Sequence, residues 1–312
     1  MSENKNKPLT KAQRAILDTA VAIRHEASTI EDAAFLARQF VQATLPHSDP
    51  KSDTWRRVNG NFSLGIQAGF DPETGTKYGV PYGVIPRLLL FWITTEAVRT
   101  KNPRLVLGSS LSDFMREVGL NPDTGGGKRS DAKRLHEQCL RLFNARISFV
   151  GDTVDGERVG KDRRTLEVTD HQVLWWDKRS PGQATLWLSY VDLTPKFFAA
   201  ITAAPIPVDT RALRVLKQSP LALDLYALSC YEAFRIEQTG HTRVIPWRSL
   251  MQQLGADYQA EGAEKEFARK CRSAMRKVAA VMPGLRVAYQ KGELCILAGS
   301  KTAIPRKKLA TA

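Results

Sequence analysis

Near the C-terminus, apolar residues recur at the spacing of two consecutive helices. Residues 247–254 place apolar side chains at i, i+3, i+4 and i+7, which is one face of a short helix, and Gly255 follows as its stop. Residues 264–281 repeat such a face over more turns, and Pro283 ends it. The spacing therefore predicts a short helix, a polar turn and a longer helix.

The pattern changes from helical to alternating directly after the longer helix. Residues 285–289 and 293–297 read as two strands, and Lys291 and Gly292 between them suit a tight turn. A helix pair that leads into a β-hairpin is the winged form of the helix-turn-helix, which lays its second helix in the major groove of DNA. The pattern thus predicts a DNA-binding unit in this part of the chain.

The longer helix carries a basic stripe beside its apolar face. Residues 264–281 contain six lysine and arginine residues but only two glutamates. Both glutamates lie in the first turn, where a negative charge interacts favourably with the helix dipole. A charged stripe is often simply solvated, but the single sign of this one favours a polyanion partner. We expect the arginines to reach bases or phosphates and the lysines to hold the phosphate backbone. The predicted DNA contacts of this unit are Lys265, Arg269, Lys270, Arg272, Arg276, Lys277 and, in the hairpin turn, Lys291.

An earlier stretch of the chain repeats this arrangement. Residues 111–119 match residues 247–255 at one constant offset, in the apolar type at each core position and in the final glycine. Residues 135–143 align with residues 267–275 after a longer turn. Strands follow in both units, so we interpret the match as an internal duplication. The start of this first recognition helix would contact DNA through Lys128, Arg129, Lys133 and Arg134.

The first unit also predicts a wing with a long tip. Its strands would be residues 147–150 and 165–168, with residues 151–164 as a loop between them. The loop holds four basic and four acidic residues, and its candidate DNA contacts are Arg163 and Arg164. A flexible charged loop without a DNA contact is an equally good interpretation.

The remaining segments complete an α+β fold with two tandem winged-helix domains (helix-turn-helix plus β-wing) and an N-terminal helical extension. Further helices are expected over residues 10–26, 30–45, 86–100, 196–201, 209–217 and 220–236. Further strands are expected over residues 62–66, 78–83, 172–176 and 184–188, and residues 46–53 and 203–207 read as linkers. The N-terminal helices would either pack on the main body or pair with another subunit.

These elements divide the chain into four expected parts. Residues 1–60 hold the N-terminal helices and a linker, and residues 61–203 form the first winged helix, with dimerisation and a DNA contact as its roles. Residues 204–300 form the second winged helix, which is the main DNA-binding unit, and residues 301–312 are a basic tail.

Length and charge support this interpretation. The chain has 312 residues, enough for two domains of ordinary size, and a net charge of +14. Residues 241–312 hold 14 basic against 5 acidic residues, and residues 101–164 hold 13 against 9. Positive charge thus gathers around the two proposed DNA-binding units. The N-terminus is polar and no uninterrupted apolar run approaches the length of a membrane span, so we expect a cytoplasmic protein.

The sequence offers no recognisable catalytic or metal-binding pattern. Residues 125–128 resemble a phosphate loop, but Pro122 stands in place of its first glycine and Arg129 in place of the Ser or Thr that holds magnesium. The four cysteines lack CxxC spacing, so we expect them to be reduced and mostly buried, with His136 and Cys139 as a packed pair. We therefore expect a binding protein that is not an enzyme and that needs no cofactor and no metal.

Two stretches of the first unit resemble a known family. Residues 82–98 read YGVIPRLLLFWITTEAV, and residues 107–117 read LGSSLSDFMRE. They are similar to the plasmid-encoded replication initiators of the RepA family, and the resemblance covers roughly residues 62–297. The resemblance implies two winged-helix domains that bind repeats in a plasmid origin as a monomer and repress the protein's own gene as a homodimer. It also implies dimerisation through the N-terminal domain and recruitment of host replication initiation proteins such as the helicase loader machinery.

The alternative is a winged-helix transcriptional regulator without a role in initiation. Such a regulator would sense a ligand in the middle region, and its support is the aromatic cluster Trp175, Trp176 and Trp187. Packing in a core or interface is the more ordinary role for these tryptophans. A nuclease or primase is a third class, which predicts metal-dependent activity on DNA.

Overall fold

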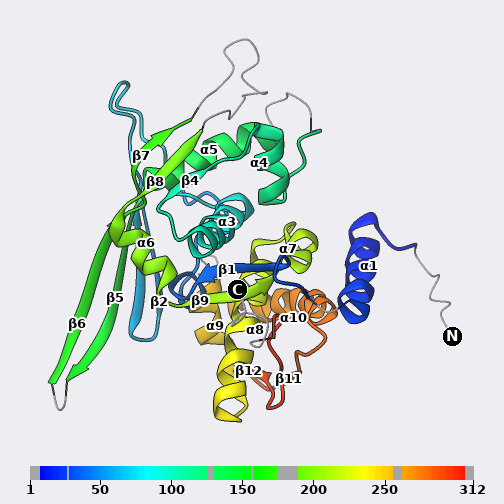
Figure 1. The fold of residues 1–312 in the computed structure, drawn as a ribbon. Helices are drawn as coiled ribbons and strands as arrows, with labels where there is room; N and C mark the ends of the chain where they lie inside the picture. Colours follow the sequence, from blue (N-terminus) through cyan, green and yellow to red (C-terminus); the bar gives the residue numbers. More distant parts are fainter. Residues whose placement is uncertain are drawn as a thin grey trace.

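The chain folds into a mixture of helices and strands in the computed structural model, which describes residues 8–26, 28–124, 130–155, 158–174, 189–255 and 262–305. The expected mixed α+β class is confirmed (Figure 1). Most of the buried apolar residues form one continuous cluster that takes in helices and strands from both halves of the chain.

The first unit is built around α3 (Val84–Thr100), which is buried on almost every side. The helix was expected to begin at Pro86 and begins at Val84, so Pro86 lies within its first turn, and Lys101 ends the helix in a left-handed conformation. The next elements are β4 (Arg104–Val106), α4 (Leu111–Val118) and α5 (Asp131–Phe143). Ser110 caps α4 and Ser130 caps α5, because each hydroxyl accepts a hydrogen bond from a backbone N–H of the first turn.

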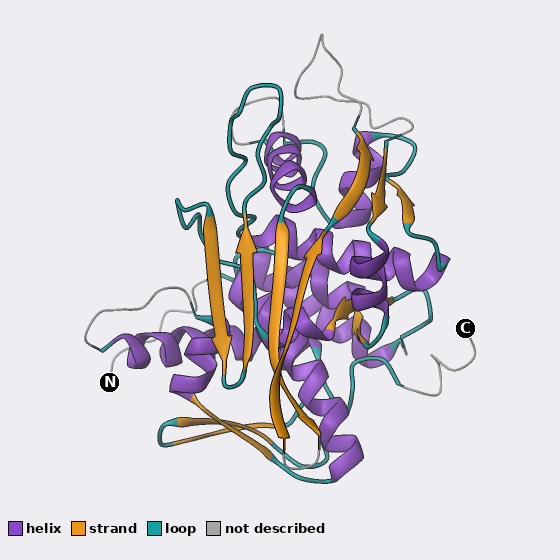
Figure 2. Ribbon diagram, turned by 90° about the vertical axis from the view of Figure 1, so that its left-hand side faces the viewer, coloured by secondary structure: helices purple, strands orange, loops and turns teal. Residues whose placement is uncertain are grey.

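Two antiparallel sheets accompany these helices. The larger has the order β2-β3-β5-β6 and consists of β2 (Thr54–Asn59), β3 (Phe62–Gln67), β5 (Arg146–Asp155) and β6 (Arg158–Glu167). Figure 2 shows its strands side by side, with helices behind them. The smaller has the order β4-β8-β7, with β7 (Thr169–Val173) and β8 (Tyr190–Leu193).

The second unit has the same order of elements as the first. It comprises α8 (Pro220–Thr239), β10 (Arg243–Pro246), α9 (Trp247–Leu254), α10 (Ala263–Val281), β11 (Val287–Gln290) and β12 (Glu293–Ile296). The expected helix pair and hairpin are thus confirmed. The two units differ in their pairing: β10 joins β12 of its own hairpin, whereas β4 joins β8. Two short helices, α6 (Pro195–Thr202) and α7 (Thr210–Leu216), lie between the units in the chain.

The prediction of a helix over residues 30–45 is wrong. The structure forms β1 (Ala33–Ala37) and the short α2 (Arg38–Gln42) there. The predicted linker at residues 203–207 is also wrong, since it lies largely in β9 (Pro205–Asp209), the antiparallel partner of β1. Four of the five residues of β1 are buried, and Phe35 N–H donates a hydrogen bond to Thr95 Oγ1 on α3. The spacing of apolar residues in this segment suited a helix. The segment forms a strand because the distant strand β9 and a side chain of α3 pair with its backbone groups.

The hairpin of the first unit is longer than predicted. Strands β5 and β6 pair along their full length, so residues 151–164 are mostly strand and not a loop. Lys161 and Asp152 face each other across the two strands and form an ion pair. Polar pairs of this kind stabilise the hairpin of β5 and β6 beyond its apolar part. The pattern of apolar residues alone therefore predicted strands that are too short.

The other strands predicted for the first unit are confirmed only in part. The strand at residues 62–66 is confirmed as β3, and its partner β2 was not expected. Residues 78–83 are described but form no strand, and a single bridge joins Phe70 and Lys77 beside them. The strand expected at residues 172–176 is β7, which begins earlier, whereas residues 184–188 lie outside the described residues.

The N-terminal helix α1 (Lys11–His25) packs on the main body. It begins with a capping box, in which Thr10 and Gln13 satisfy each other's backbone N–H groups. Its buried residues are Ile16 and Ala20, and the helix contacts α7 and α10 (Figure 1). One of the two alternatives for this segment, packing on the main body, is therefore observed.

The cysteines are free and buried, as expected. Burial raises the pKa of the Cys139 and Cys230 thiols, because the thiolate is less well solvated there. Within the described ranges, no group of three side chains that could ligate a metal gathers, and no helix is long and apolar enough to cross a membrane.

A buried charge cluster joins the two units. Arg87 on α3 donates hydrogen bonds of 2.8 Å to both carboxylate oxygens of Asp224 on α8, and His47 Nε2 lies 2.8 Å from Asp224 Oδ2. The side chains of Arg87 and Asp224 are only 4% and 7% exposed. Further guanidinium N–H groups donate to the carbonyl oxygens of Leu45, Pro46 and Gly83. This single arginine therefore fixes α8 and residues 45–47 to α3.

Two pKa shifts in this cluster predict how stability depends on pH. Burial lowers the pKa of His47 below its ordinary value of 6.5. Burial opposes the ionisation of Asp224, but Arg87 and His47 outweigh it and lower its pKa from 3.8 to about 2. The unfolded chain therefore binds more protons than the folded one at acid pH. We expect the free energy of unfolding to decrease as the pH falls below about 6.5, and further below about 4, in urea titrations at a series of pH values.

One substitution isolates the part of this profile that belongs to His47. His47→Gln removes the titrating ring, so the decrease below about pH 6.5 should become smaller. His241→Gln, at an exposed position, is the control and should leave the profile unchanged. His136, whose pKa is also lowered by burial, stays in both variants. A His47→Gln profile identical to that of the parent chain would contradict the assignment.

Candidate nucleic-acid interface

Helix α10 presents one apolar and one basic face, as predicted. Its buried residues, among them Phe267, Cys271 and Met275, lie on the side that contacts α8 and α9. Gly262 precedes the helix with a φ of +79°, a conformation that favours glycine. The predicted contact residues of this helix are all exposed: Lys265, Arg269, Lys270, Arg272, Arg276 and Lys277.

Arg269 and Lys270 share a carboxylate of their own helix. Arg269 donates two hydrogen bonds of 2.7 Å to Glu266, and Lys270 Nζ lies 3.7 Å from a carboxylate oxygen of Glu266. The hydrogen bonds from Arg269 lower the pKa of Glu266. An exposed ion pair of this kind adds little stability. It does occupy N–H donors of Arg269 that could otherwise donate hydrogen bonds to a base or a phosphate. The i, i+3 spacing of Glu266 and Arg269 is the sequence signal for this pair.

Arg272 lies against two aromatic rings. Its guanidinium carbon is 5.3 Å from the ring centroid of Trp247 and 5.8 Å from that of Tyr289. The two rings stack on each other with 6.2 Å between centroids. Trp247 begins α9 and is 2% exposed, whereas Tyr289 belongs to β11 and is 41% exposed. Neither ring was among the predicted contacts, because nothing in the local pattern of residues places either of them beside Arg272.

The hairpin turn is attached to the same place. Lys291, the predicted contact in this turn, is exposed. The neighbouring Gly292 has a φ of +83°, and its carbonyl oxygen accepts a hydrogen bond of 2.9 Å from the backbone N–H of Trp247. The turn is therefore fixed to the start of α9, the element that also supplies one of the rings beside Arg272.

A hollow of about 430 Å³ lies along another side of α10. Its wall on α10 includes Lys270, Ser273 and Lys277, and its opposite wall includes Ser219 and Pro220 at the start of α8. Lys277 forms no ion pair with any described residue. Lysine ammonium groups and a serine hydroxyl are donors suited to phosphate oxygens, so this side of the helix suits a polyanion backbone.

The described basic residues of α5 in the first unit lie apart from those of α10. On α5, Lys133 and Arg134 are exposed, and Arg134 pairs with Asp131 at 3.2 Å. The predicted contacts Lys128 and Arg129 lie outside the described residues. Figure 1 places α5 and α10 in opposite halves of the molecule, so the two basic helices do not merge into one patch.

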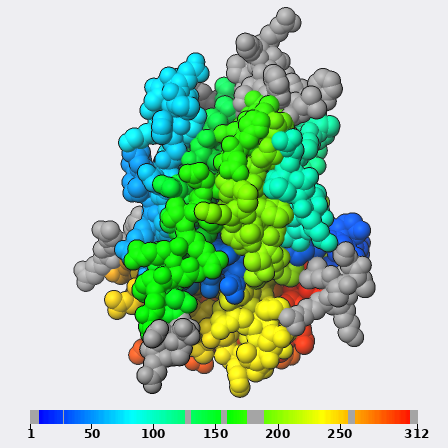
Figure 3. Space-filling view, turned by 60° about the vertical axis from the view of Figure 1, so that its left-hand side comes forward, coloured from blue at the N-terminus to red at the C-terminus, as the bar shows by residue number. Residues whose placement is uncertain are grey.

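Arg163 and Arg164 lie in strand β6 and not in the loop that was predicted for them. Both are exposed, and Figure 3 shows their hairpin, in green, at the molecular surface. Consecutive residues of a strand point to opposite faces of the sheet, so the two arginines do not act together from one side. Arg164 pairs with the neighbouring Asp162 at 2.9 Å, which leaves Arg163 as the better placed of the two for an anion.

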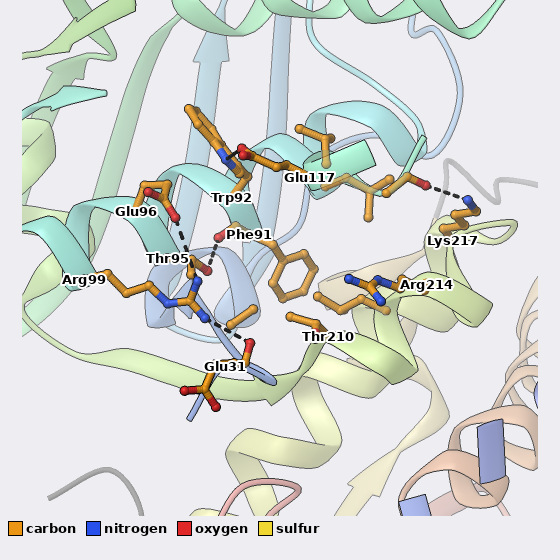
Figure 4. Close-up of a pocket in the computed structure, with 15 residues that line it drawn as sticks. Glu31, Phe91, Trp92, Thr95, Glu96, Arg99, Glu117, Thr210, Arg214 and Lys217 are labelled. Atoms are coloured by element: carbon orange, nitrogen blue, oxygen red, sulfur yellow. Dashed lines mark hydrogen bonds and ion pairs between the residues drawn. The ribbon is translucent and has the colours of Figure 1, made fainter. Parts of the chain in front are cut away.

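A cavity of about 270 Å³ lies where α3, α4 and α7 meet (Figure 4). Trp92 Nε1 donates a hydrogen bond of 3.1 Å to Glu117 at this cavity. Lys217 Nζ, at the end of α7, donates one of 2.5 Å to the carbonyl oxygen of Gly119, at the end of α4. Burial raises the pKa of Glu96 in the cavity wall. The bond from Trp92 joins α3 to α4, and the bond from Lys217 joins the end of α7 to the end of α4, so the polar groups at this cavity hold these helices together.

Comparison with known proteins gives one family and two solved structures. Residues 80–249, more than half of the chain, match the family model described as plasmid-encoded RepA protein. No curated protein matches the chain. The crystal structure of domains 2–3 of RctB has a TM-score of 0.48 and 14% identity, over 83% of this chain and 96% of that one. A selenomethionine derivative of RctB domains 2 and 3 has a TM-score of 0.49 and 13% identity, over 82% and 94% of the two chains.

Proposed function

The chain belongs to the family of plasmid-encoded RepA proteins, which are replication initiators, and on this premise we propose that it binds double-stranded DNA at repeated sites in its plasmid's origin. The observation that carries the proposal is the outward basic face of α10 beside the hairpin of β11 and β12. Four cations of this face make no ion pair with the described part of the chain: Lys265, Arg272, Arg276 and Lys277. Such a face offers donors in the arrangement that recognition helices use.

In the proposed complex, α10 enters the major groove as the recognition helix of the second winged helix. Arg272 and Arg276 reach base edges, and Lys277 holds a phosphate from the hollow beside α8. Arg269 contributes less than the other arginines, because Glu266 already accepts its hydrogen bonds. Lys291 contacts the backbone from the hairpin turn, and α5 of the first winged helix supplies a second footprint.

The protein acts, in this proposal, through binding and without catalysis. It works in the cytoplasm, where it recruits host replication initiation proteins such as the helicase loader machinery. It exists as a monomer in equilibrium with a homodimer, and the dimer represses the protein's own promoter. Membership of the RepA family supports these points.

Footprinting over the plasmid's replication region tests the proposal. We expect protection of several adjacent direct repeats, with centres about two helical turns of DNA apart, beside an AT-rich tract. Arg276→Ala should weaken protection of every repeat, because each repeat is read by the same helix. The Lys196→Ala variant is the control, since this exposed lysine lies on α6 and is not one of the predicted DNA contacts.

The opposite result would identify the alternative function. Protection of a single inverted repeat over a promoter, with no repeats beside it, would favour a transcriptional regulator without a role in initiation. The three tryptophans that supported this alternative, at positions 175, 176 and 187, lie outside the described residues.

A further inference from the structure

Three separate elements converge on the guanidinium group of Arg272. The arginine comes from α10, Trp247 from the start of α9 and Tyr289 from β11 of the hairpin. The two rings lie nearly parallel, with 21° between their planes. A hydrogen bond from Trp247 N–H to the carbonyl oxygen of Gly292 fixes the hairpin turn to the same helix start. The position of this one side chain therefore depends on the recognition helix and on the wing together.

A cation held over ring faces keeps its hydrogen-bond donors. The attraction acts between the positive charge and the face of the ring, whereas the five N–H donors of a guanidinium group lie in its own plane. Arg272 makes no hydrogen bond or ion pair with the described residues. Arg269, three residues earlier, has two hydrogen bonds to Glu266 instead. Of these two arginines, Arg272 is the one that is both held in place and ready to donate.

We propose that Trp247 and Tyr289 form a clamp that orients Arg272 toward one guanine of the DNA site, with Tyr289 as a positioning residue that sets the preference at that base pair. The inference rests on the proposed function of α10. An arginine that is oriented before binding loses fewer rotamers when it donates two hydrogen bonds to guanine O6 and N7. The wing thereby contributes to base recognition without touching the base.

The two rings differ in how well they can be tested. Trp247 is 2% exposed, so its replacement would leave a cavity in the core and disturb the unit as a whole. Tyr289 is 41% exposed and lies on an outer strand of the β10-β12-β11 sheet, so it tolerates replacement. Tyr289→Leu removes the ring face, and Tyr289→Phe keeps it. Comparison of these two variants separates the ring from the hydroxyl group.

The experiment measures base preference at each position of the site. The full chain selects sites from a pool of duplexes with randomised base pairs, and the position whose preference is lost in Arg272→Ala is the one that Arg272 reads. We expect Tyr289→Leu to lower the preference at this position by roughly 2- to 30-fold and to leave the other positions unchanged. Tyr289→Phe should keep the preference. In the Arg272→Ala background, Tyr289→Leu should have no further effect.

Each other outcome overturns the inference in a recognisable way. If Tyr289→Leu keeps the base preference at this position, Tyr289 does not orient Arg272. If Tyr289→Leu lowers the base preference equally at all positions, the role of Tyr289 is structural only. Thermal unfolding checks that each variant is folded, and Tyr289→Thr repeats the test if Tyr289→Leu folds poorly. If Arg272→Ala itself leaves every preference unchanged, or if the parent chain selects no site, the proposed function of α10 fails and not only the clamp.

Discussion

Replacing Asp224 with alanine should lower the free energy of unfolding by about 3–5 kcal/mol. The change leaves the guanidinium group of Arg87 buried without its carboxylate partner, at a site where both side chains are less than a tenth exposed. It also removes the acceptor that lies 2.8 Å from His47. Urea unfolding near neutral pH, followed by circular dichroism, measures the difference between the variant and the parent chain.

A surface pair with the same chemistry provides the control. Arg104 donates two hydrogen bonds of 2.7 Å to Asp192, but its side chain is 55% exposed. Water screens such a pair, so Asp192→Ala should cost no more than about 1 kcal/mol. Similar losses for Asp224→Ala and Asp192→Ala would show that the buried cluster does not hold the two units together.

Arg272→Ala should weaken specific DNA binding by about 1–3 kcal/mol, which is roughly a 5- to 150-fold rise in Kd. The expected reason is the loss of two hydrogen bonds to a base edge in the major groove. The measurement is a titration of a labelled duplex that carries one repeat, compared with a duplex of unrelated sequence. Because Arg272 reads a base in this proposal, binding to the unrelated duplex should change much less.

Two neighbours on the same helix serve as matched controls. Lys277→Ala should weaken binding to both duplexes alike and lower the salt dependence by about one unit, because a lysine that contacts phosphate carries no sequence information. Arg269→Ala should cost less than Arg272→Ala, since Glu266 already accepts hydrogen bonds from Arg269. If Arg272→Ala, Arg276→Ala and Lys277→Ala all leave affinity unchanged, α10 does not lie in the groove.

The local elements of the second unit could be predicted from the sequence. Helix α10 has its apolar face at Phe267, Cys271 and Met275, and the basic stripe on its other side is exposed as expected. This success has a physical reason: helical periodicity and turn chemistry act over a few residues, so the residues that decide them are neighbours in the chain. The same holds for the hairpin of β11 and β12, whose Gly292 suits the turn.

The candidate site could be predicted only in part. The sequence identified which cations share a face, but it assigned Arg269, Arg272 and Arg276 the same role. The structure separates them, because Arg269 meets Glu266 and Arg272 meets two rings. Arg163 and Arg164 also differ, since strand geometry turns them to opposite faces. The placement of a long, charged side chain depends on what surrounds its end, and most of those surroundings come from elsewhere in the chain.

The sequence by itself determined the helices and turns whose signals are local, the concentration of positive charge, and the resemblance to RepA proteins that the family match over residues 80–249 confirms. Only the tertiary structure decided the partners that lie far apart in the chain. Arg87 meets Asp224 across 137 positions, and β1 is a strand because β9 pairs with it. Strand pairing and buried ion pairs take their free energy from long-range contacts, which the spacing of apolar and polar residues along one segment does not encode.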